Sequence, residues 1–421
     1  MIKEFTIRNY LSFKNETIFT MEADMERVSE HQNHLVKFGD DHILKIASFY
    51  GPNGSGKSNF LKAFLFFKDI IKYGVENFNE DQLNRRLPRR LKEFEKFNFC
   101  HDDDNTIDFK IFFINKKYEI GYELKIEKVD NSVIINYENM SYRQIKSKDF
   151  IFVFERNKTK LELSEELKLN LPSVDFNFSD KVTIVNFINK FFVNDKNKND
   201  GVFDVINNFM FEISTMLVIN SSSIIPFLEK DVKYKWLQEE RIRTKTIEII
   251  NDLGIKINDI LIDKDEDTIY LIREIDGKKY KLDIDKESEG TKTLLFLLPN
   301  LILNIIAGGV FIVDEIDAHL HPKLIKAVIE IFTSKHNNKA QLIFSSHDIL
   351  NMTNDLFRRD EIWFVVKDEK FSSELFALTD FVNYKGERVR KDAKYSKQYL
   401  EGKYGADPFI QKGVFWDGKN S

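Results

Sequence analysis

The hydrophobic and polar positions of the N-terminal residues predict strands, a turn and a helix in that order. Residues 2–19 alternate loosely between apolar and polar side chains, which is typical of an edge strand followed by a hairpin. The mostly apolar run at 43–50 predicts a buried strand. After a glycine-rich stretch, phenylalanine and isoleucine recur at helical spacing from 60 to 71, so we expect an amphipathic helix that begins near Lys57.

The middle of the chain first alternates with a period of two and then changes to a helical period. The alternation predicts an antiparallel meander with strands at 107–113, 118–126, 133–137, 150–154 and 161–163. The helical period predicts helices at 184–191, 205–218 and 236–252. The pair Asp276-Gly277 then separates strands at 268–275 and 278–284, as expected for a hairpin.

In the last third of the chain, two short apolar runs end in polar residues. Residues 310–313 predict a central parallel strand, and this strand is followed by Asp314 and Glu315. Residues 341–345 predict another strand, with His347 just past its carboxyl end. Helices are expected to begin near Thr293 and at Pro322.

Composition and charge exclude several classes of protein. The 421 residues suffice for two or three domains, and a formal net charge of -5 argues against a surface that coats nucleic acid along the whole chain. The single cysteine, Cys100, excludes a disulfide framework. The N-terminus lacks the pattern of a signal peptide, and the longest apolar stretch, 294–307, is broken by Pro299. We therefore expect a cytoplasmic protein that does not span a membrane.

The glycine-rich stretch before the first helix matches the pattern G-x-x-x-x-G-K-[ST]. A strand, a glycine-rich turn and a helix form a P-loop, whose backbone N–H groups cradle phosphate at a positive helix N-terminus. Lys57 is expected to reach the β- and γ-phosphates of ATP, and Ser58 to bind Mg²⁺. The residues predicted to contact the nucleotide are Gly51, Pro52, Asn53, Gly54, Ser55, Gly56, Lys57, Ser58 and Asn59.

The polar residues at the ends of the two later strands supply the other half of such a site. Asp314 is expected near the Mg²⁺ of the nucleotide. Glu315 is placed to act as the general base on the attacking water, which makes it a catalytic residue together with Lys57. His347 is predicted to contact the γ-phosphate and to sense its loss.

Two further stretches are weaker signals for the same site. Ser288 and Gly290 precede a helix and suit a close approach to phosphate, although an ordinary helix cap has the same pattern. Asp317 is expected in a loop that faces a partner subunit. We interpret His319 and His321 as loop-shaping residues, because no third histidine or cysteine lies close by to complete a metal site.

This ordered set resembles the ATP-binding-cassette head domains, and more closely their chromosome-maintenance and recombination-repair branch than the transporters. The resemblance identifies 51–58 with Walker A, 310–315 with Walker B, Ser288-Glu289-Gly290 with a degenerate signature motif, Asp317 with the D-loop and His347 with the switch histidine. It implies an α/β P-loop NTPase head built from both chain ends. We expect its parts at 1–75 and 266–421, with an inserted β-meander and helical region at 76–265.

A narrower resemblance concerns the biological role. Residues 2–13, 287–291 and 314–322 resemble the AAA-15/AAA-21 group of prokaryotic ATPases. Residues 356–364 and 399–406 are similar to abortive-infection ATPases of the AbiL/RloA type. This similarity implies defence against phage beside a separately encoded effector, often a TOPRIM-type nuclease. Fewer than about eighty residues follow His347, so we expect any nuclease activity to come from a partner.

Three functions remain open at this point. In the favoured one, two heads sandwich two ATP molecules between Lys57 of one subunit and Ser288 and Gly290 of the other, and hydrolysis gates an effector. In the second, ATP is a structural ligand of a scaffold or sensor that recognises phage protein or DNA. The third is a repair ATPase that binds DNA, for which the basic cluster at 84–92 is the candidate contact. A solvated loop or helix face is the favoured interpretation of this cluster, because no aromatic residue is interleaved in it for base stacking.

Overall fold

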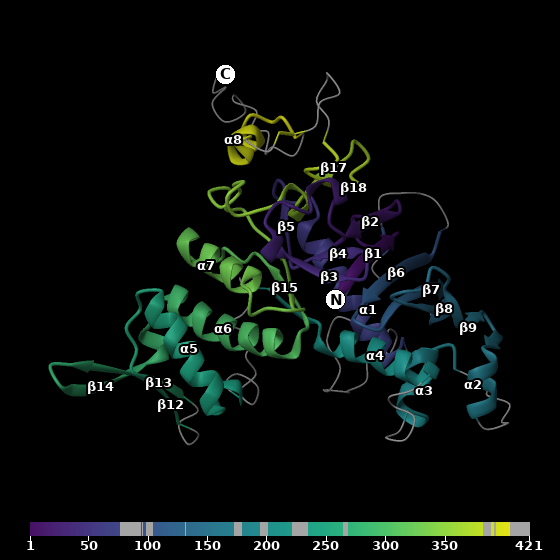
Figure 1. Ribbon diagram of the computed structural model, residues 1–421, viewed down its shortest axis with the longest axis horizontal. Helices are drawn as coiled ribbons and strands as arrows, with labels where there is room; N and C mark the ends of the chain where they lie inside the picture. The colour runs from purple at the N-terminus through teal and green to yellow at the C-terminus, as the bar shows by residue number, and fades with distance from the viewer. Residues whose placement is uncertain are drawn as a thin grey trace, which may run out of the picture.

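The computed structural model describes residues 1–75, 94, 96–97, 104–130, 132–171, 179–193, 201–220, 235–263, 268–381, 389–390 and 393–404 (Figure 1). Two large β-sheets and a helix between them form its centre. A three-stranded and a two-stranded sheet are added to this centre.

The first large sheet is parallel except for its last strand and has the order β11-β15-β16-β5-β17-β18. Its strands are β5 (Ile46–Tyr50), β11 (Leu217–Asn220), β15 (Val310–Asp314), β16 (Gln341–Ser345), β17 (Ile362–Lys367) and β18 (Ser373–Ala377). Since β5 lies beside β16 and β17, the sheet brings both halves of the chain together, and the carboxyl ends of its parallel strands meet at one edge.

The second large sheet is antiparallel and has the order β10-β9-β8-β7-β6-β1-β2. Its strands are β1 (Ile2–Arg8), β2 (Thr17–Thr20), β6 (Thr106–Ile114), β7 (Tyr118–Val129), β8 (Ser132–Gln144), β9 (Ile151–Asn157) and β10 (Lys160–Leu163). The predicted meander is therefore confirmed. Its first strand, β6, also pairs with β1, so strands from the middle region and from the N-terminus share one sheet.

The helix α1 (Lys57–Tyr73) lies between the two sheets. Phe64 of α1 stacks on Phe5 of β1 with ring centroids 4.1 Å apart, and Phe67 lies 5.7 Å from Phe109 of β6. On its other side α1 contacts β11, β15 and β16. Burying each of these rings contributes roughly 1.5–3 kcal/mol, so aromatic packing fixes the helix whose first turn belongs to the P-loop.

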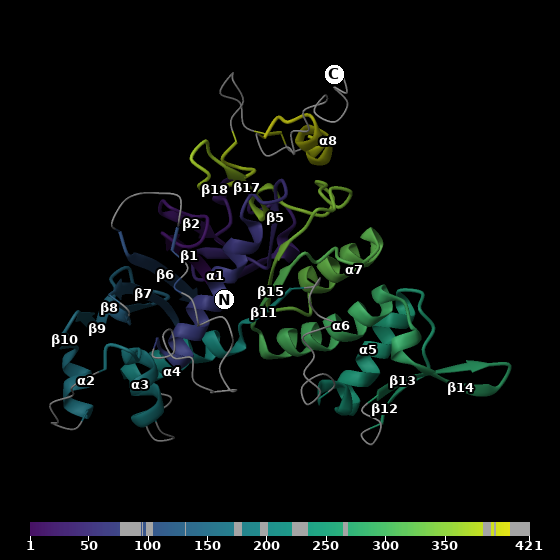
Figure 2. The ribbon, with the colours of Figure 1, turned by 180° about the vertical axis from the view of Figure 1, so that it is seen from behind.

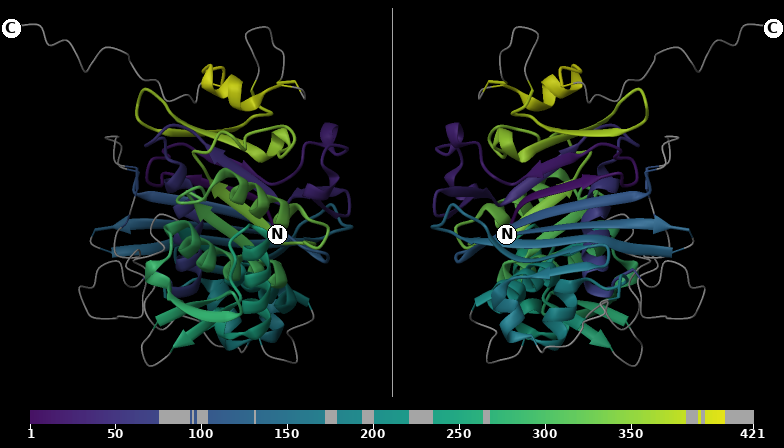
Figure 3. Two further views of the ribbon diagram at one scale, coloured as in Figure 1. Left: turned by 90° about the vertical axis from the view of Figure 1, so that its left-hand side faces the viewer. Right: turned by 90° about the vertical axis from the view of Figure 1, so that its right-hand side faces the viewer.

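The other helices cover the two sheets from different sides (Figures 1 and 2). Those near the meander are α2 (Glu165–Asn170), α3 (Ile184–Phe191) and α4 (Gly201–Thr215). Those near the parallel sheet are α5 (Glu240–Asp252), α6 (Glu289–Ala307), α7 (Pro322–Thr333) and α8 (Tyr395–Leu400). Side views show α8, in yellow, at one end of the molecule and the teal helices of the middle region at the other (Figure 3).

The small elements complete the chain. The three-stranded sheet contains β12 (Asp259–Asp263), β13 (Thr268–Ile275) and β14 (Lys278–Asp283), and β3 (Leu35–Phe38) pairs with β4 (Asp41–Leu44). Short 3₁₀ helices occur at η1 (Met25–Arg27), η2 (Gln32–His34), η6 (Lys235–Gln238), η7 (Ile284–Lys286) and η8 (Arg359–Glu361). The predicted hairpin at Asp276-Gly277 is confirmed as the turn between β13 and β14.

Three sequence expectations are wrong in their details. β1 is not an edge strand, because β6 covers the side that β2 leaves open. Ile43 and Leu44 belong to β4 instead of the strand before the P-loop, which begins at Ile46. Val218 lies in β11, since α4 ends at Thr215. The period of a strand does not report its neighbours, which explains the first error. In the other two cases one apolar run serves two elements, and the apolar pattern alone does not mark the break.

Among the described residues, α6 is long and apolar enough to cross a membrane by length and composition alone. It packs against α5 and β15, and its Leu294, Leu297 and Leu301 are fully buried. Packing inside the protein therefore accounts for its apolar character.

Candidate nucleotide-binding site

The turn between β5 and α1 has a backbone that requires glycine at two places. Gly51 and Gly56 have φ angles of 148° and 116°, which residues with a side chain rarely adopt. A Cβ added to Gly51 would lie 2.2 Å from the carbonyl oxygen of Val365, and one added to Gly56 would lie 2.3 Å from Ser373 Oγ. The turn ends at the N-terminus of α1, where free N–H groups attract an anion.

Two serines that are distant in sequence hold this turn from behind. Ser373 Oγ, at the start of β18, donates to the carbonyl of Ser55 at 2.5 Å and lies 2.8 Å from Ser12 Oγ. Ser12 Oγ accepts from Asn59 Nδ2 at 3.0 Å. Asn59, expected to contact the nucleotide, thus has its amide on Ser12. Motif spacing does not identify Ser12 or Ser373 as supports of the turn, because only the tertiary fold brings them to it.

Lys57 is buried beneath the turn. Its Nζ donates to the carbonyls of Gly51 and Pro52, at 2.8 and 3.1 Å. Burial lowers the pKa of Lys57, while the carboxylates at and after the end of β15, Asp314 foremost, oppose that change. A buried ammonium gains from a negative neighbour, so this side chain is suited to a phosphate group.

Asp314, at the end of β15, is the centre of a hydrogen-bond network. Its Oδ1 accepts from Ser58 Oγ at 3.1 Å and from Ser345 Oγ at 2.6 Å. Its Oδ2 accepts from Asn220 Nδ2 at 3.1 Å. Three strands and the start of α1 therefore converge on one carboxylate.

The donor set around Asp314 fits Mg²⁺. A hydroxyl and a carboxylate are the hard oxygen ligands that this ion prefers, and it commonly takes one or two protein ligands together with waters and phosphate oxygens. In the described part of the chain, no group of three or more His, Cys, Asp or Glu side chains could hold a metal ion on its own. Ser58 and Asp314 would therefore hold Mg²⁺ jointly with a nucleotide.

Glu315 follows directly and has an unusual backbone. Its φ is 54°, which is uncommon for a residue with a side chain and occurs often at active sites. Its N–H donates to Ser345 Oγ at 2.7 Å. Ser345 thus donates to Asp314 and accepts from Glu315, so one hydroxyl fixes both acidic residues. The sequence places Ser345 only within a strand, because a buried strand serine carries no recognisable motif.

The loops that follow β15 and β16 meet at Asp317. Its Oδ2 accepts the backbone N–H of His347 at 3.0 Å, and its Oδ1 is buried without a hydrogen-bond partner. Leaving such an acceptor unpaired costs roughly 1–3 kcal/mol. Asp317 and the exposed His347 therefore lie at the same sheet edge as Asp314. In the same loop, His321 Nδ1 accepts the N–H of Lys323 and caps α7, so His321 shapes a helix start, as expected.

Ser288 and Gly290 lie at the N-terminus of α6. The helix begins at Glu289, earlier than the expected Thr293, because Ser288 Oγ accepts the N–H of Thr291 at 3.2 Å and caps it. A Cβ on Gly290 would lie 2.9 Å from the carbonyl oxygen of His319, so this helix start packs on the loop that carries Asp317. Ser288 itself is exposed.

Two sequence features lie outside the described residues. These are the basic cluster at 84–92 and the single cysteine, Cys100.

The strand order and the turn after β5 place the protein among the P-loop NTPases with an α/β fold. Within that class, residues 46–352 match the model of the AAA-21 family, described as "AAA domain, putative AbiEii toxin, Type IV TA system". The chain therefore belongs to this family, and the predicted AAA-21 membership is confirmed.

Individual proteins show more distant similarity. The "Retron Vc95 probable ATPase" of Vibrio cholerae serotype O1 biovar El Tor is 24% identical over 344 residues, with 72% of this chain and 66% of that protein covered. The chain thus spans just under two thirds of that relative's length.

Two solved structures also match. The "SMC head domain from Thermotoga maritima" has a TM-score of 0.43 at 15% identity, covering 89% of this chain and 98% of that one. An SmcHead bound to the C-winged helix domain of ScpA has a TM-score of 0.44 at 13% identity, covering 89% and 97%. Both TM-scores are below 0.5, and the family assignment rests on the sequence match.

Proposed function

We propose that this protein is an Mg²⁺-dependent, ABC-type ATPase that binds and hydrolyses ATP at the P-loop. The observation that carries the proposal is the 3.1 Å hydrogen bond between Ser58 and Asp314, which are 256 positions apart in the sequence. Both predicted metal ligands thus occupy one place, at the start of α1 and the end of β15. The name of the retron relative, a probable ATPase, supports the same activity.

Each residue has a distinct part in this proposal. Bound Mg²⁺ and ATP supply a triphosphate whose terminal P–O bond is cleaved by water. The backbone N–H groups of 51–58, except at Pro52, which has none, and the ammonium of Lys57 bind the phosphates. Asn59 acts through Ser12, which it holds against the turn. Ser58 and Asp314 hold the metal ion.

The hydrolytic step is assigned to the residues past the strand ends. Glu315 accepts a proton from the attacking water, with its backbone held by Ser345. His347 contacts the γ-phosphate and responds to its loss. The hydrogen bond from His347 to Asp317 would transmit that response to the neighbouring loop.

We further propose that two heads close around ATP as a homodimer or within a larger homo-oligomer. The exposed Ser288 and the nearby Gly290 lie at the positive end of α6, which suits the phosphate of a nucleotide held by a partner subunit. In this arrangement 1–75 and 266–421 form the head and 76–265 is its insertion, from which β11 joins the parallel sheet of the head.

The proposed role is anti-phage defence by abortive infection in the cytoplasm. The retron name of the relative and the toxin–antitoxin description of the family support it. ATP-driven closure of the heads would gate a separately encoded effector, a TOPRIM-type or other nuclease, with DNA or a phage protein as the possible trigger.

Replacement of the base tests the enzymatic proposal. Glu315→Gln keeps the size of the side chain but removes its ability to take a proton, so phosphate release should stop while ATP binding persists. Lys57→Ala should lose binding itself. Glu330→Gln, which alters an exposed carboxylate on α7, is the matched control. Normal turnover by Glu315→Gln would refute the assignment of the base, and failure of the wild-type protein to take up ATP would refute the whole proposal.

A second candidate is a scaffold or sensor that binds ATP with little turnover. The degenerate signature Ser288-Glu289-Gly290 favours it, because such a motif leaves room for slow or partner-dependent turnover. Phosphate release measured with and without DNA, together with particle size with and without ATP, separates the two functions. A DNA-repair ATPase would instead show salt-sensitive duplex binding that is lost on changing Arg85, Arg86, Arg89 and Arg90.

A further inference from the structure

The hydroxyl of Ser373 bonds to the carbonyl of the P-loop residue that precedes Gly56. Ser373 begins β18 and is 3% exposed, and its Oγ donates to the carbonyl of Ser55 at 2.5 Å. The two residues are 318 positions apart in the sequence. Ser55 is buried as well, so the hydroxyl replaces water as the partner of this carbonyl and sets the direction in which the carbonyl points.

The number of protons available gives this contact its direction. Ser373 Oγ also lies 2.8 Å from Ser12 Oγ, and Ser12 Oγ accepts from Asn59 Nδ2 at 3.0 Å. A carbonyl can only accept and each hydroxyl has one proton, so Ser373 donates to Ser55 and Ser12 donates to Ser373. The hydrogen bonds therefore run in one direction, from Asn59 in the first turn of α1 through both serines and back to the P-loop.

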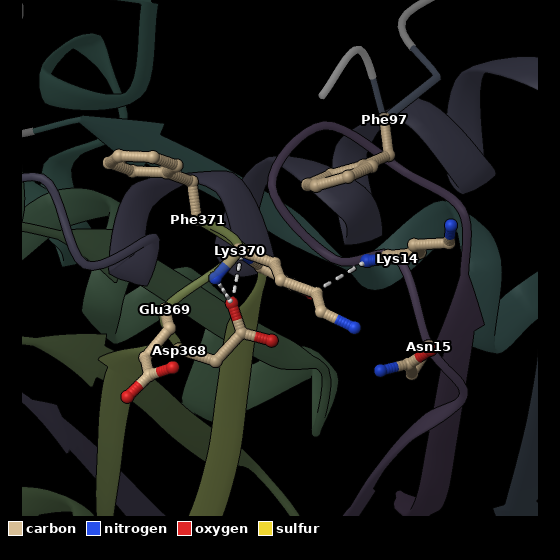
Figure 4. A pocket seen from close by; sticks show the side chains of 8 residues that line it. Lys14, Asn15, Phe97, Asp368, Glu369, Lys370 and Phe371 are labelled. Atoms are coloured by element: carbon tan, nitrogen blue, oxygen red, sulfur yellow. Dashed lines mark hydrogen bonds between the residues drawn. The ribbon is translucent and has the colours of Figure 1, made fainter. Parts of the chain in front are cut away.

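The turn that joins β17 to β18 holds Ser373 in position. Asp368 Oδ1 accepts the N–H groups of Lys370 and Ser372, both at 2.8 Å, and Figure 4 shows this turn from close by. The N–H of Ser373 itself donates to the carbonyl of Ser12 at 2.6 Å. Because the backbone on both sides of the hydroxyl is fixed, Ser373 loses little further freedom when it bonds to the P-loop, as precise positioning of a site requires.

The peptide group between Ser55 and Gly56 is the part of the P-loop that this bond controls. A peptide group is planar and trans, so its C=O and its N–H point in opposite directions. Since Ser373 holds the carbonyl of Ser55, the N–H of Gly56 points away from Ser373. Gly56 directly precedes α1, so this N–H belongs to the positive end of the helix. If the peptide group rotated, a carbonyl oxygen would take the place of the N–H and repel a phosphate.

The glycine at this position does not fix the orientation by itself. Rotation of the peptide group changes φ of Gly56, which is 116°, and glycine adopts positive and negative φ about equally readily. A bond from outside the P-loop is therefore needed to hold the peptide group in one orientation, and Ser373 supplies it.

We propose that Ser373 is a positioning residue of the nucleotide site, whose hydroxyl keeps the N–H of Gly56 turned towards the phosphates. The inference rests on the proposed function, because it concerns the phosphates of the same bound ATP. It gives the turn between β17 and β18 a part in phosphate binding, although this turn touches only the back of the P-loop.

Equilibrium titrations of the full chain with ATP and with inorganic tripolyphosphate, both with Mg²⁺, test the effect on binding. A hydrogen bond to a charged group contributes roughly 1.5–3 kcal/mol, so Ser373→Ala should weaken both ligands by the same factor, about 10- to 150-fold. Ser373→Thr keeps a hydroxyl and should restore most of the affinity. Ser12→Ala leaves the bond between Ser373 and Ser55 intact, so its effect should be smaller.

Thr183→Val is the matched control. Thr183 is fully buried, and its Oγ1 donates to the carbonyl of Ile71 at 3.1 Å, near the other end of α1. Ser373→Ala and Thr183→Val each lose one buried bond from a hydroxyl to a carbonyl, so their melting temperatures should fall by similar amounts. Only Ser373→Ala should lose ligand affinity, which separates positioning of the P-loop from support of the fold.

The N–H of Gly56 can also be observed directly, because Gly56 is the only glycine in the sequence that follows a serine. Labelling serine carbonyls with ¹³C and glycine amides with ¹⁵N in cell-free synthesis therefore selects one amide resonance. This resonance should shift when tripolyphosphate binds the wild type, and it should shift less in Ser373→Ala. If tripolyphosphate binds without moving it, or if Ser373→Ala binds both ligands as tightly as the wild type, this inference is overturned and the proposed ATPase stands. If the wild type binds neither ligand, the proposed function falls first.

Discussion

The side chain of Gln341 hydrogen-bonds both backbone groups of Ile2. Its Oε1 accepts the N–H at 2.6 Å, and its Nε2 donates to the carbonyl at 2.9 Å. The same Nε2 donates to the carbonyl of Leu44 at 3.0 Å, and the residue is fully buried. Gln341 begins β16 of the parallel sheet and Ile2 begins β1 of the antiparallel sheet, so one amide joins the two sheets.

Removing that amide should destabilise the protein strongly. Gln341→Leu leaves three buried backbone groups without their partner, so we expect a loss of about 2–5 kcal/mol in the free energy of unfolding. Denaturant unfolding followed by circular dichroism measures it. Gln144→Leu, at an exposed position on β8, is the control and should change stability by less than about 0.5 kcal/mol. Equal stability of the two variants would contradict the linking role of Gln341.

The P-loop glycines should differ sharply in what they tolerate. Gly56→Ala places a Cβ 2.3 Å from Ser373 Oγ and 2.7 Å from Ser12 Oγ at a positive φ, so it should abolish nucleotide binding and shift the turn. Gly54→Ala also has a positive φ but finds no atom within 4 Å of its Cβ. Gly54→Ala should therefore cost only about 1–2 kcal/mol of backbone strain.

Nucleotide titration and thermal unfolding of both glycine variants test this difference. The expected order is wild type, then Gly54→Ala, then Gly56→Ala in both measurements. Comparable ATP affinity in the two variants would show that Ser12 and Ser373 do not limit the space behind the turn.

The sequence correctly predicts the elements whose alternation of apolar and polar residues follows directly from having one buried face. The strands expected at 107–113 and 118–126 are found as β6 and β7 with similar bounds, because one face of each is buried and the other is not. The pairing of β6 with β1 was not predictable, since the period of a strand reports its faces and not its neighbours.

The same limit applies to the site. Motifs predict the roles of Lys57, Ser58, Asp314 and Glu315. The structure brings Ser58 to Asp314. The serines that support them carry no such signal. Ser373, for example, acts on a carbonyl 318 positions away, and only the fold determines that contact.

A half-buried lysine on α1 should make stability depend on pH. Burial, together with the charge of the neighbouring Lys72, lowers the pKa of Lys68 to about 8, and its Nζ donates to the carbonyl of Met216. Between about pH 8 and 10.5 the unfolded chain binds more protons than the folded one, so wild-type stability should rise with pH in this window.

Two variants isolate that effect. Lys68→Met removes the buried charge, so its advantage over the wild type at pH 7 should shrink, by on the order of 1–3 kcal/mol, as the pH rises to 10.5. Lys68→Arg stays charged throughout and should show no such gain. Chemical denaturation at a series of pH values measures both. Parallel profiles for the wild type and Lys68→Arg would show that Lys68 keeps its proton across the window.

Ser345 should act on the rate of hydrolysis and not on nucleotide affinity. Its Oγ donates to Asp314 and accepts from the N–H of Glu315, at 2.6 and 2.7 Å, so Ser345→Ala frees the backbone that carries the base. Misplacing a general base commonly costs a factor of roughly 10²–10⁴, and Ser345 acts only indirectly, so we expect kcat to fall about 10- to 100-fold.

Ser48→Ala is the matched control: Ser48 is equally buried, in β5, and its Oγ donates to the carbonyl of Glu361 away from the acidic pair. Both variants should lose similar stability, because each loses one buried hydroxyl, but only Ser345→Ala should lose turnover. A fall in ATP affinity with kcat unchanged would mean that Ser345 serves the metal ligand Asp314 and not the base.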